Sequence, residues 1–386
     1  MKSSSPIHYH SGDFPPKHLE WERLIPLLGP TSAALARYDG ILNAIPNATV
    51  LLSPLMTQEA VLTSRIEGTQ ATMGEVLEFE AGIRPKERVA ERTADIHEVL
   101  NYRKAMHRAV ELMDELPLCQ RVLKDAHAVL MEGVRGKSKS PGGYRKVPNW
   151  IGPPGCSIKE AKYVPIAADK LPEAMGRWEQ FIHADYQDRL VQLAILHAEF
   201  EALHPFLDGN GRLGRMFVPL YLCSINLLQR PMFYISAYLE ARRDEYYERL
   251  PAVSQVGDWT GWCRFFLEAM QAQAEENLHK AKAILVLYEQ SLDRALELIR
   301  SQHAKKAMDF IFSRPIFSSS SFNNESGIPK ATAIRILKVL RDNDFFMILE
   351  EQVGSKPAVL GYQALFAITE GWEDSRIGSP NKRLTF

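Results

Sequence analysis

The sequence predicts a mainly α-helical protein with one β-hairpin near its middle and, at its C-terminal end, a helix-turn-helix followed by two strands. Three observations predict this class. Apolar residues recur every three or four positions over most of the 386 residues. Strand-like runs bounded by turn residues fall in two regions, near residues 147–166 and 345–361. A chain of this length is also too long for one small core, so two or three domains are expected.

The composition is that of an ordinary globular chain. Apolar residues make up 46% of it, and a formal net charge of −1 provides no general attraction to nucleic acid or membranes. Four scattered cysteines without a CxxC pair argue against a zinc site or a disulfide framework. The longest apolar run, residues 216–228, is interrupted by Pro219 and Asn226 and is too short to span a bilayer. We therefore expect a cytoplasmic protein without a membrane partner.

The N-terminal elements follow from local patterns. Residues 1–20 are rich in Ser, Pro and His and predict an extended arm, which either packs on the domain or becomes ordered on binding. Helical periodicity then appears over residues 21–45. A short helix with a charged loop is expected over 71–90, a long helix over 91–116 and a further helix over 118–136.

One more N-terminal helix, at about residues 54–68, has a clear signal at each of its ends. Ser53 suits the N-cap and Gly68 suits a left-handed C-terminal cap. Thr63 and Glu67 are one turn apart, so they share a face of this helix.

The middle of the chain changes from helix to strand and back. Residues 147–151 are short and β-like, residues 152–155 are a turn signal, and residues 162–166 are expected to return as a second strand. Helices are predicted over 171–184 and 188–203. The hairpin is therefore expected before these two helices, and the second of them leads into residues 204–215, the most informative stretch of the chain.

That stretch is HPFLDGNGRLGR, from His204 to Arg215, between two apolar helices. Pro205 disfavours helical geometry at His204, and helix is expected to restart near Arg212. The backbone N–H groups of the glycine-rich turn then point outward at a helix N-terminus, which suits an anion. A base, a hard carboxylate ligand (Asp208), this amide cradle and two arginines within twelve residues indicate phosphoryl or nucleotidyl transfer.

This stretch resembles the signature of the Fic (filamentation induced by cAMP) family, HPFx[DE]GNGRxxR, at every fixed position. The resemblance implies a helical fold that transfers AMP from ATP to a protein hydroxyl. It implies that His204 is the general base, that Asp208 holds magnesium and that Phe206 anchors the loop in the core. It further implies ATP-binding roles for a set of residues in four regions. They are Glu67, Asn149, Trp150, Ile151, Gly152, Gly209, Asn210, Gly211, Arg212, Arg215, Tyr246 and Tyr247.

The segment TSRIEG at residues 63–68 matches the inhibitory-helix pattern of the same family, [ST]xxxE[GN]. The resemblance implies that Thr63 and Glu67 belong to an inhibitory contact in which Glu67 pairs with Arg215 and occupies the position of the γ-phosphate. The hairpin resembles the family's flap, which holds a target segment by strand addition. His197 lies seven residues before His204, but no third metal ligand has suitable spacing, so we expect a core histidine there.

The C-terminal part begins with a long helix. A narrow apolar seam is expected to pack on the catalytic domain or on a second copy of the chain, giving a homodimer. The seam consists of Leu278, Ala281, Leu285, Tyr288, Leu292, Ala295 and Ile299. Helix, turn, helix and hairpin over residues 304–361 resemble a winged helix-turn-helix, in which the helix from Lys330 would enter the DNA major groove. Acidic residues offset the basic ones, so DNA binding is not favoured over protein contact.

These patterns divide the chain into five parts. They are residues 1–115, a helical region with the inhibitory helix; 116–256, the Fic catalytic domain; 257–300, a helical linker; 301–370, the winged helix; and 371–386, a polar tail.

The resulting hypothesis is an autoinhibited protein adenylyltransferase. It uses ATP and Mg²⁺, and its partners are target proteins with a modifiable Ser, Thr or Tyr hydroxyl, the chain itself included. Two alternatives stay open. One is a de-AMPylase in which Glu67 positions a water at the same site, and the other is a DNA-binding regulator with a Fic sensor domain.

Overall fold

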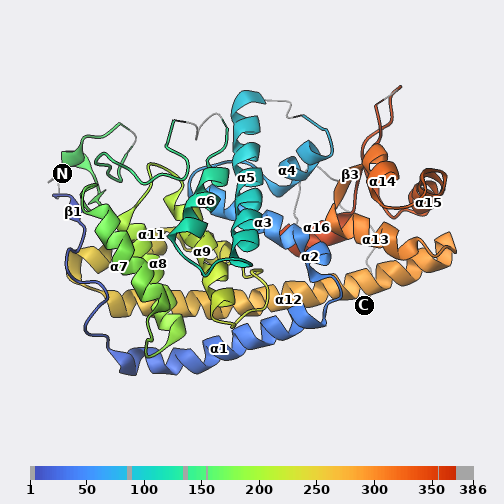
Figure 1. Cartoon of the computed structure of the whole chain (residues 1–386). Helices are drawn as coiled ribbons and strands as arrows, with labels where there is room; N and C mark the ends of the chain where they lie inside the picture. Colours follow the sequence, from blue (N-terminus) through green and yellow to red (C-terminus); the bar gives the residue numbers. More distant parts are fainter. Residues whose placement is uncertain (1–4, 85–88, 134–137, 154, 355, 371–386) are drawn as a thin grey trace. The chain divides into compact units, whose positions relative to one another are not determined.

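The computed structural model describes residues 5–84, 89–133, 138–153, 155–354 and 356–370 (Figure 1). The described residues have sixteen α-helices, five short strands and a 3₁₀ turn, which confirms the prediction of a mainly α-helical protein. Two compact units emerge, residues 1–48 with 55–281 and residues 49–54 with those from 282 onward. None of the helices in the described part of the chain combines the length and apolarity needed to cross a bilayer.

The first unit is built from ten helices and the first part of an eleventh. They are α1 (Trp21–Ala44), α3 (Ser53–Ile66), α4 (Met73–Glu80), α5 (Val89–Met113), α6 (Gln120–Leu130), α7 (Leu171–His183), α8 (Arg189–Leu203), α9 (Asn210–Ser224), α10 (Ser236–Ala241), α11 (Arg243–Val256) and the N-terminal half of α12 (Trp259–Ile299). Helix α5 packs on α6, and α8 packs on both α7 and α9. The predicted helices are therefore present, with bounds within a few residues of those expected, except that the helix expected to run to residue 136 ends at Leu130.

Helix α8 is the central element because its side chains are almost all buried. Two buried indoles attach other helices to it. The Trp178 Nε1–H of α7 donates to the Leu196 carbonyl at 2.8 Å, and the Trp262 Nε1–H of α12 donates to the Ala194 carbonyl at 2.7 Å. Asp188 caps its first turn, as its side chain accepts from the backbone N–H groups of Leu190 and Val191. The helix that ends at the candidate site is therefore fixed along its whole length.

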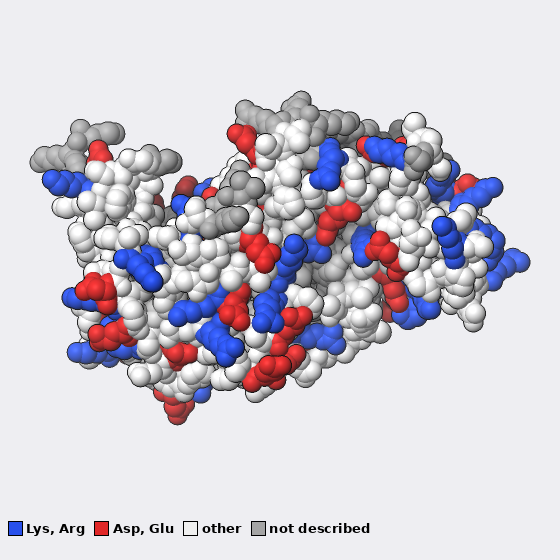
Figure 2. All heavy atoms as spheres, turned by 45° about the horizontal axis from the view of Figure 1, so that its top comes forward, with Lys and Arg blue, Asp and Glu red and all other residues white. Residues whose placement is uncertain are grey.

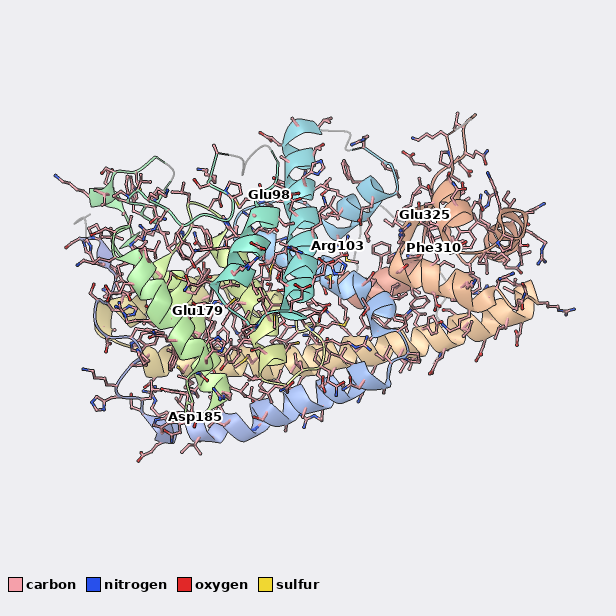
Figure 3. The ribbon with its side chains drawn as sticks, viewed as in Figure 1. Glu98, Arg103, Glu179, Asp185, Phe310 and Glu325 are labelled. Atoms are coloured by element: carbon pink, nitrogen blue, oxygen red, sulfur yellow. The ribbon has the colours of Figure 1, made fainter. Side chains whose placement is uncertain are left out.

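Helix α6 starts without a capping side chain of its own, and a glutamate of α7 replaces it. Glu179, labelled in Figure 3, accepts at 3.0 Å from the backbone N–H of Gln120, the first residue of α6. The Gln120 side chain donates to the other carboxylate oxygen at 2.8 Å. A carboxylate at a helix N-terminus satisfies an unpaired amide and interacts well with the helix dipole, so this contact fixes α6 against α7.

The expected hairpin is present only as one antiparallel bridge, between Ile151 and Tyr163. The second strand, β2 (Tyr163–Val164), pairs instead in parallel with β1 (Ile7–His8). The first strand does not form, and its segment has other partners: Arg145 donates to the Val147 carbonyl, and the Asn149 side chain donates to the Phe206 carbonyl at 3.3 Å. After the bridge, the chain enters the 3₁₀ turn η1 (Ile158–Glu160).

The second unit contains the rest of α12 and a small mixed domain. Its elements are α2 (Ala48–Leu51, from Thr49 onward), α13 (Ala304–Ser313), β3 (Ile316–Ser318), α14 (Ser319–Glu325), α15 (Lys330–Asp342), β4 (Met347–Glu350), β5 (Val359–Gly361) and α16 (Gln363–Glu370). The strands form an antiparallel sheet in the order β3-β5-β4. The sequence analysis missed β3, which lies beside a serine run, and α16, whose Leu365 and Phe366 are buried.

The predicted apolar seam of α12 is buried at four of its seven positions, namely Ala281, Tyr288, Ala295 and Ile299. Leu278, Leu285 and Leu292 are only half-buried, and Ile284, which the predicted seam left out, is buried. Polar contacts help to orient this part of the helix: the Tyr288 hydroxyl donates to Asp309 Oδ1 of α13 at 2.5 Å, and Ser291 Oγ lies 2.6 Å from the Tyr362 hydroxyl. Heptad spacing alone cannot locate such contacts.

Charged residues are spread over the face of the molecule shown in Figure 2. Lysine and arginine side chains alternate there with aspartate and glutamate side chains. This mixture agrees with the formal net charge of −1.

Candidate active site

The site is built on the six-residue loop His204–Gly209 between α8 and α9. His204 ends α8 in the left-handed conformation, with φ of 46°, and Gly209 adopts φ of 79° as the residue before α9. Helix α9 begins at Asn210, two residues earlier than expected. The first turn of α9 therefore lies inside the signature, and its backbone N–H groups belong to a helix N-terminus.

The side chain of Asn210 braces this loop. Its Oδ1 accepts from the Phe206 backbone N–H at 2.8 Å, and its Nδ2 donates to the Phe206 carbonyl at 3.0 Å. Phe206 is fully buried, as expected of a core anchor, and stacks on His127 with ring centroids 3.8 Å apart. Both polar ends of the Asn210 amide are thus used inside the protein, and only its backbone N–H belongs to the helix terminus.

His127 of α6 contacts the loop His204–Gly209 and helps to fix it, a role that the sequence analysis missed. The Gly142 backbone N–H donates to His127 Nδ1 at 2.9 Å, so the ring proton is on Nε2, which lies 3.0 Å from the Asp208 carbonyl and donates to it. Burial lowers the pKa of His127 to about 4. Its position far outside the signature carries no sequence signal.

Arg145 fixes the backbone of the catalytic histidine candidate. This arginine is 2% exposed, and its Nε donates to the His204 carbonyl at 2.9 Å, while its backbone N–H donates to the Pro205 carbonyl at 3.0 Å. One guanidinium nitrogen also donates to the Leu203 carbonyl at 3.2 Å. Leu203 is the last residue of α8 and His204 is its C-cap, so the Arg145 side chain satisfies carbonyls that the helix leaves unpaired. The sequence analysis assigned no role to Arg145.

His204 is held in its neutral form. Burial lowers the pKa of its imidazole to about 4, and the charge of Glu67 only partly offsets this effect. Its Nδ1 is buried and has no hydrogen-bond partner among the described residues. A neutral imidazole at pH 7 can accept a proton, which is the property required of a general base.

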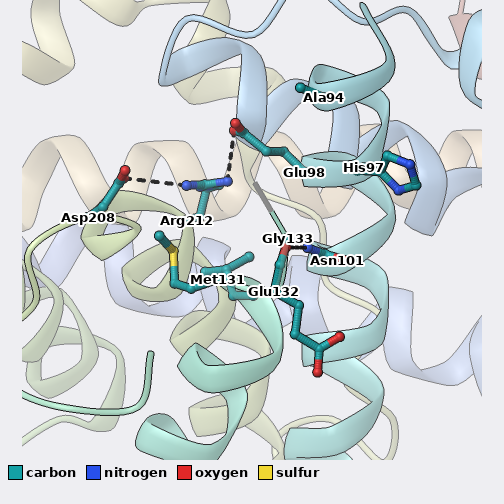
Figure 4. Close-up of a pocket in the computed structure, with 10 residues that line it drawn as sticks. Ala94, His97, Glu98, Asn101, Met131, Glu132, Gly133, Asp208 and Arg212 are labelled. Carbon is teal, nitrogen blue, oxygen red and sulfur yellow. Dashed lines mark hydrogen bonds and ion pairs between the residues drawn. The ribbon is translucent and has the colours of Figure 1, made fainter. Parts of the chain in front are cut away.

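Arg212 and Asp208 face a smaller cavity of about 350 Å³, shown in Figure 4. Arg212 is 4% exposed and donates to Glu98 of α5 at 3.0 Å, with Asp208 Oδ1 at 3.5 Å on its other side. Asp208 Oδ1 also accepts from the Gly209 backbone N–H at 2.6 Å. Part of the expected cradle is therefore already used by the protein. Glu98 is a site residue that sequence reasoning missed, since a glutamate in a long helix looks like a solvated residue.

Arg215 makes a compact set of contacts with α3. Its Nε donates to Thr63 Oγ1 at 2.7 Å, and one terminal nitrogen donates to the Thr63 carbonyl at 2.9 Å and to Glu67 Oε1 at 2.6 Å. The Arg215 side chain is 1% exposed and that of Glu67 is 35% exposed. The two residues expected from the inhibitory pattern thus both meet the last arginine of the signature.

Gly211 explains how the glutamate reaches this position. A Cβ atom on Gly211 would lie 2.1 Å from Glu67 Oε1 and 3.0 Å from an Arg215 guanidinium nitrogen. The carboxylate therefore rests against the backbone of the first turn of α9, where any side chain would exclude it. An anion already occupies part of the space in front of this helix terminus.

The electrostatics of the pair agree with its geometry. Burial by itself raises the pKa of Glu67, but the attraction of Arg215 outweighs it and the net pKa is lowered. Burial likewise acts to lower the pKa of Arg215, yet the charge of Glu67 prevails and raises it. Both groups are ionised at neutral pH, so their contact is a charge-assisted hydrogen bond.

A larger cavity of about 1110 Å³ lies beside His204 and the pair formed by Arg215 and Glu67. His204, Gly211, Arg215 and Glu67 line it on one side. Of the other expected ATP residues, four line it: Ile151, Gly152, Tyr246 and Tyr247. The remaining predicted ATP residues are not among its lining residues: Asn149, Trp150, Gly209, Asn210 and Arg212. Arg212 and the predicted metal ligand Asp208 line the smaller cavity instead. The Trp150 indole donates to the Cys156 carbonyl at 2.9 Å.

Tyr246 and Tyr247 each form a hydrogen bond with a neighbouring helix beside the cavity. Tyr246 is buried and its hydroxyl lies 3.0 Å from His197 Nε2, while His197 Nδ1 contacts the Gly214 carbonyl at 3.1 Å. His197 is thus a satisfied core histidine, as expected, and burial lowers its pKa to about 3. The Tyr247 hydroxyl donates to the Ile66 carbonyl at 3.1 Å, which attaches α11 to the end of α3.

Glu201 is a further carboxylate on this cavity that sequence reasoning missed. Burial raises its pKa to about 8, although Arg215 acts against this effect. Its Oε1 is buried without a hydrogen-bond partner in the described part of the chain. The same oxygen would lie 2.3 Å from a Cβ on Gly214, so it rests against α9 one turn beyond Gly211. Glu201 is therefore largely a neutral acid at pH 7.

Comparison with known proteins agrees with this architecture. Residues 25–111 match the model described as "Fic/DOC family N-terminal", and residues 117–222 match that described as "Fic/DOC family". A Fic family protein from Desulfovibrio desulfuricans G20 superposes with a TM-score of 0.57 at 21% identity, covering 90% of this chain and 98% of that one. A Fic domain-containing signaling protein from Bacteroides thetaiotaomicron VPI-5482 has a TM-score of 0.52 at 14% identity, covering 67% and 97%. At these low identities, the superpositions show similarity of fold alone.

Proposed function

Because the chain carries both Fic/DOC family domains, we propose that it is a protein adenylyltransferase that transfers AMP from ATP to a Ser, Thr or Tyr hydroxyl. Members of this family commonly transfer AMP or other nucleotide-derived groups to proteins. The observation that carries the proposal is the convergence of a neutral His204, a helix N-terminus and Arg215 on one cavity large enough for a nucleotide.

In the proposed reaction, the target hydroxyl attacks the α-phosphorus of ATP. The new bond joins the hydroxyl oxygen to that phosphorus, and the bond to the bridging oxygen breaks, so pyrophosphate leaves with the electron pair. His204 accepts the hydroxyl proton, and Arg145 keeps the imidazole in place through the His204 carbonyl. The first turn of α9 and the two arginines stabilise the phosphate charge, and such positioning and charge stabilisation supply most of the catalysis in related reactions.

Asp208 is the proposed residue for holding Mg²⁺ with the nucleotide. Its side chain is 44% exposed and lies beside the start of α9. One carboxylate suits Mg²⁺ when phosphates supply the other oxygens. When bound, the ion would neutralise charge on the leaving pyrophosphate.

The contact of Glu67 with Arg215 is the proposed inhibitory device. It uses the guanidinium that we assign to the γ-phosphate, and it places a carboxylate against Gly211 where a phosphate would approach. Like charges in a site of low dielectric repel strongly, so ATP binds poorly or in an unproductive pose. Thr63 strengthens the contact by accepting from the same arginine.

The test is incorporation of labelled AMP into proteins of a cell lysate. Glu67→Gly should label faster than wild type, because it frees Arg215 and removes the competing charge. Glu67→Gly with His204→Ala should lose transfer by about 10²–10⁴-fold, the usual effect of removing a general base. Labelling by this double variant at the rate of Glu67→Gly would contradict the assignment of His204. Release of AMP from labelled proteins by the wild type, but not by Glu67→Gly, would favour the removal reaction instead.

The second unit is proposed to be a winged helix. Its order of helix, strand, two helices and two strands, with the sheet order β3-β5-β4, supports this assignment. Helix α15 exposes four basic residues, which favours contact with an acidic surface, nucleic acid included. They are Lys330, Arg335, Lys338 and Arg341. Salt-dependent retardation of duplex DNA, lost on Arg335→Ala and Lys338→Ala, would establish nucleic acid binding, and its absence at low salt would exclude it.

A further inference from the structure

The segment of residues 5–10, here called the docked segment, lies along the strand that precedes α7. The Ile7 backbone N–H donates to the Lys162 carbonyl at 3.1 Å, and that of Tyr9 donates to the Val164 carbonyl at 3.0 Å. This parallel pairing places Ile7 opposite Tyr163. Residues 7–9 of the N-terminal arm therefore pack on the domain.

Buried polar groups fix the downstream end of the docked segment. The Tyr9 hydroxyl donates to Glu199 Oε1 at 2.7 Å, and His10 Nε2 lies 2.9 Å from Glu199 Oε2. His10 Nδ1 also contacts Ser254 Oγ at 2.7 Å. Glu199 belongs to α8, five residues before His204, so the segment is attached to the helix that carries the proposed base.

The upstream end of the docked segment reaches the larger cavity. Ser5 and Ile7 both line it, together with His204 and Arg215. Ser5 precedes the first ladder hydrogen bond and its side chain is exposed. Two residues span at most about 7 Å, so the anchored Ile7 confines Ser5 to the neighbourhood of the cavity. A hydroxyl of the chain itself thus lies on the same cavity as His204 and Arg215.

We propose that Ser5 is an acceptor of AMP within the same chain. This inference rests on the proposed function and names one hydroxyl that the site would modify. The Ser5 oxygen forms a bond to the α-phosphorus of ATP, pyrophosphate leaves with the electrons of the broken bond, and the Ser5 proton passes to His204. The product is a phosphodiester that joins AMP to the docked segment.

Ser5 is the suitable hydroxyl of this segment. Tyr9, the other hydroxyl residue between positions 5 and 10, is buried and already donates to Glu199. Burial beside that carboxylate raises the pKa of the Tyr9 phenol, which further disfavours its deprotonation. Ser11 lies beyond the anchor and is not among the residues that line the cavity. Ser11 therefore provides a matched control in the same arm.

The experiment uses the full chain with Glu67→Gly, incubated with ATP and Mg²⁺ and analysed by peptide mass mapping. AMP is expected on the peptide that contains residue 5. Ser5→Ala in this background should abolish the label on that peptide, Ser5→Thr should retain it, and Ser11→Ala should leave it unchanged. Because the acceptor is in the same chain, the labelled fraction at a given time should not change over a hundredfold range of protein concentration.

Detaching the segment gives an independent check. Tyr9→Phe combined with His10→Ala removes its polar anchors, so labelling of Ser5 should slow by at least tenfold while labelling of lysate proteins persists. Label on other peptides only, an unchanged label after Ser5→Ala, or a yield that rises with protein concentration would overturn the inference while leaving AMP transfer intact. Absence of any AMP transfer and of pyrophosphate release from ATP would overturn the proposed function itself, and this inference with it.

Discussion

Glu98 holds Arg212 much as Glu67 holds Arg215, although the two acids come from different helices. Both arginines are nearly inaccessible to solvent, and each donates to a carboxylate at 3.0 Å or less. The resting site therefore presents two cations whose charges are already compensated.

Glu98→Gln should increase the affinity of the Glu67→Gly variant for ATP. The substitution removes a negative charge that competes with phosphate for Arg212, and an effect of about 1 kcal/mol corresponds to roughly a fivefold lower Kd. Isothermal titration calorimetry with ATP measures this change. Glu132→Gln is the matched control, because Glu132 lines the same cavity. An equal gain from both variants would mean that general charge, and not the contact with Arg212, is responsible.

Glu201→Gln should remove a pH dependence of stability. The pKa of Glu201 rises from about 4.5 to about 8 on folding, so its contribution is fully present below pH 4.5 and is lost as the pH rises toward 8. Glutamine imitates the neutral acid at every pH. We expect the variant to exceed wild type by on the order of 1–3 kcal/mol at pH 8.5 and to match it at pH 4.5.

Denaturant unfolding at the two pH values checks this expectation. Glu248→Gln serves as control, since Glu248 is an exposed acid that lines the same cavity. A gain of equal size at both pH values would show that Glu201 does not titrate between them.

At the scale of elements, helix α12 offers a test at two adjacent positions, the buried Ile284 and the half-buried Leu285. Ile284→Asp should destabilise the second unit by more than about 3 kcal/mol, because it buries a charge without a partner. Leu285→Asp, at a half-buried position, should cost less than half as much. Urea unfolding followed by circular dichroism compares them. Equal losses of stability in the two variants would mean that Leu285 contributes as much as Ile284 to the packing of α12, as the predicted seam requires.

The elements also show what the sequence could predict. Helices with strong periodicity or clear end signals were predicted to within a few residues, and the Gly68 cap was confirmed by its φ of 105°. The signature and the inhibitory pattern located His204, Arg215, Thr63 and Glu67, which the structure brings to one place. Each motif is contiguous and could be recognised in the sequence, although the contact between the two motifs joins residues 148 to 152 positions apart.

The remaining parts depend on contacts between segments distant in sequence. Arg145, His127 and Glu98 reach the signature from 59 to 114 residues away, and their neighbours in the sequence give no sign of it. The first strand of the hairpin does not form, and its Val147 carbonyl accepts from the Arg145 side chain instead of from a second strand. Strand preference is decided by such tertiary partners as much as by composition.

At the scale of the whole molecule, the inhibitory contact should appear as a difference in ligand-dependent stability. A ligand that binds only the folded state stabilises it by about 2.7 kcal/mol at one hundred times its Kd. Millimolar ATP with Mg²⁺ should therefore raise the Tm of Glu67→Gly by a few degrees and that of wild type by much less. Differential scanning calorimetry separates the two units if they unfold apart. Glu67→Gly with Arg215→Ala should lose the gain, and an equal shift in wild type would mean that Glu67 does not oppose ATP.

The docking of residues 5–10 also has a consequence for the order in which the chain acquires its structure. Their partners in β2 and α8 are synthesised more than 150 residues later, since Tyr163 pairs with Ile7 and Glu199 binds Tyr9. Closing so large a loop is entropically costly and yields little until both partners are in place. A nascent chain therefore carries this segment unpaired through the synthesis of the first half of the domain. The wall that it adds to the cavity is completed only after the helix bearing His204 has formed.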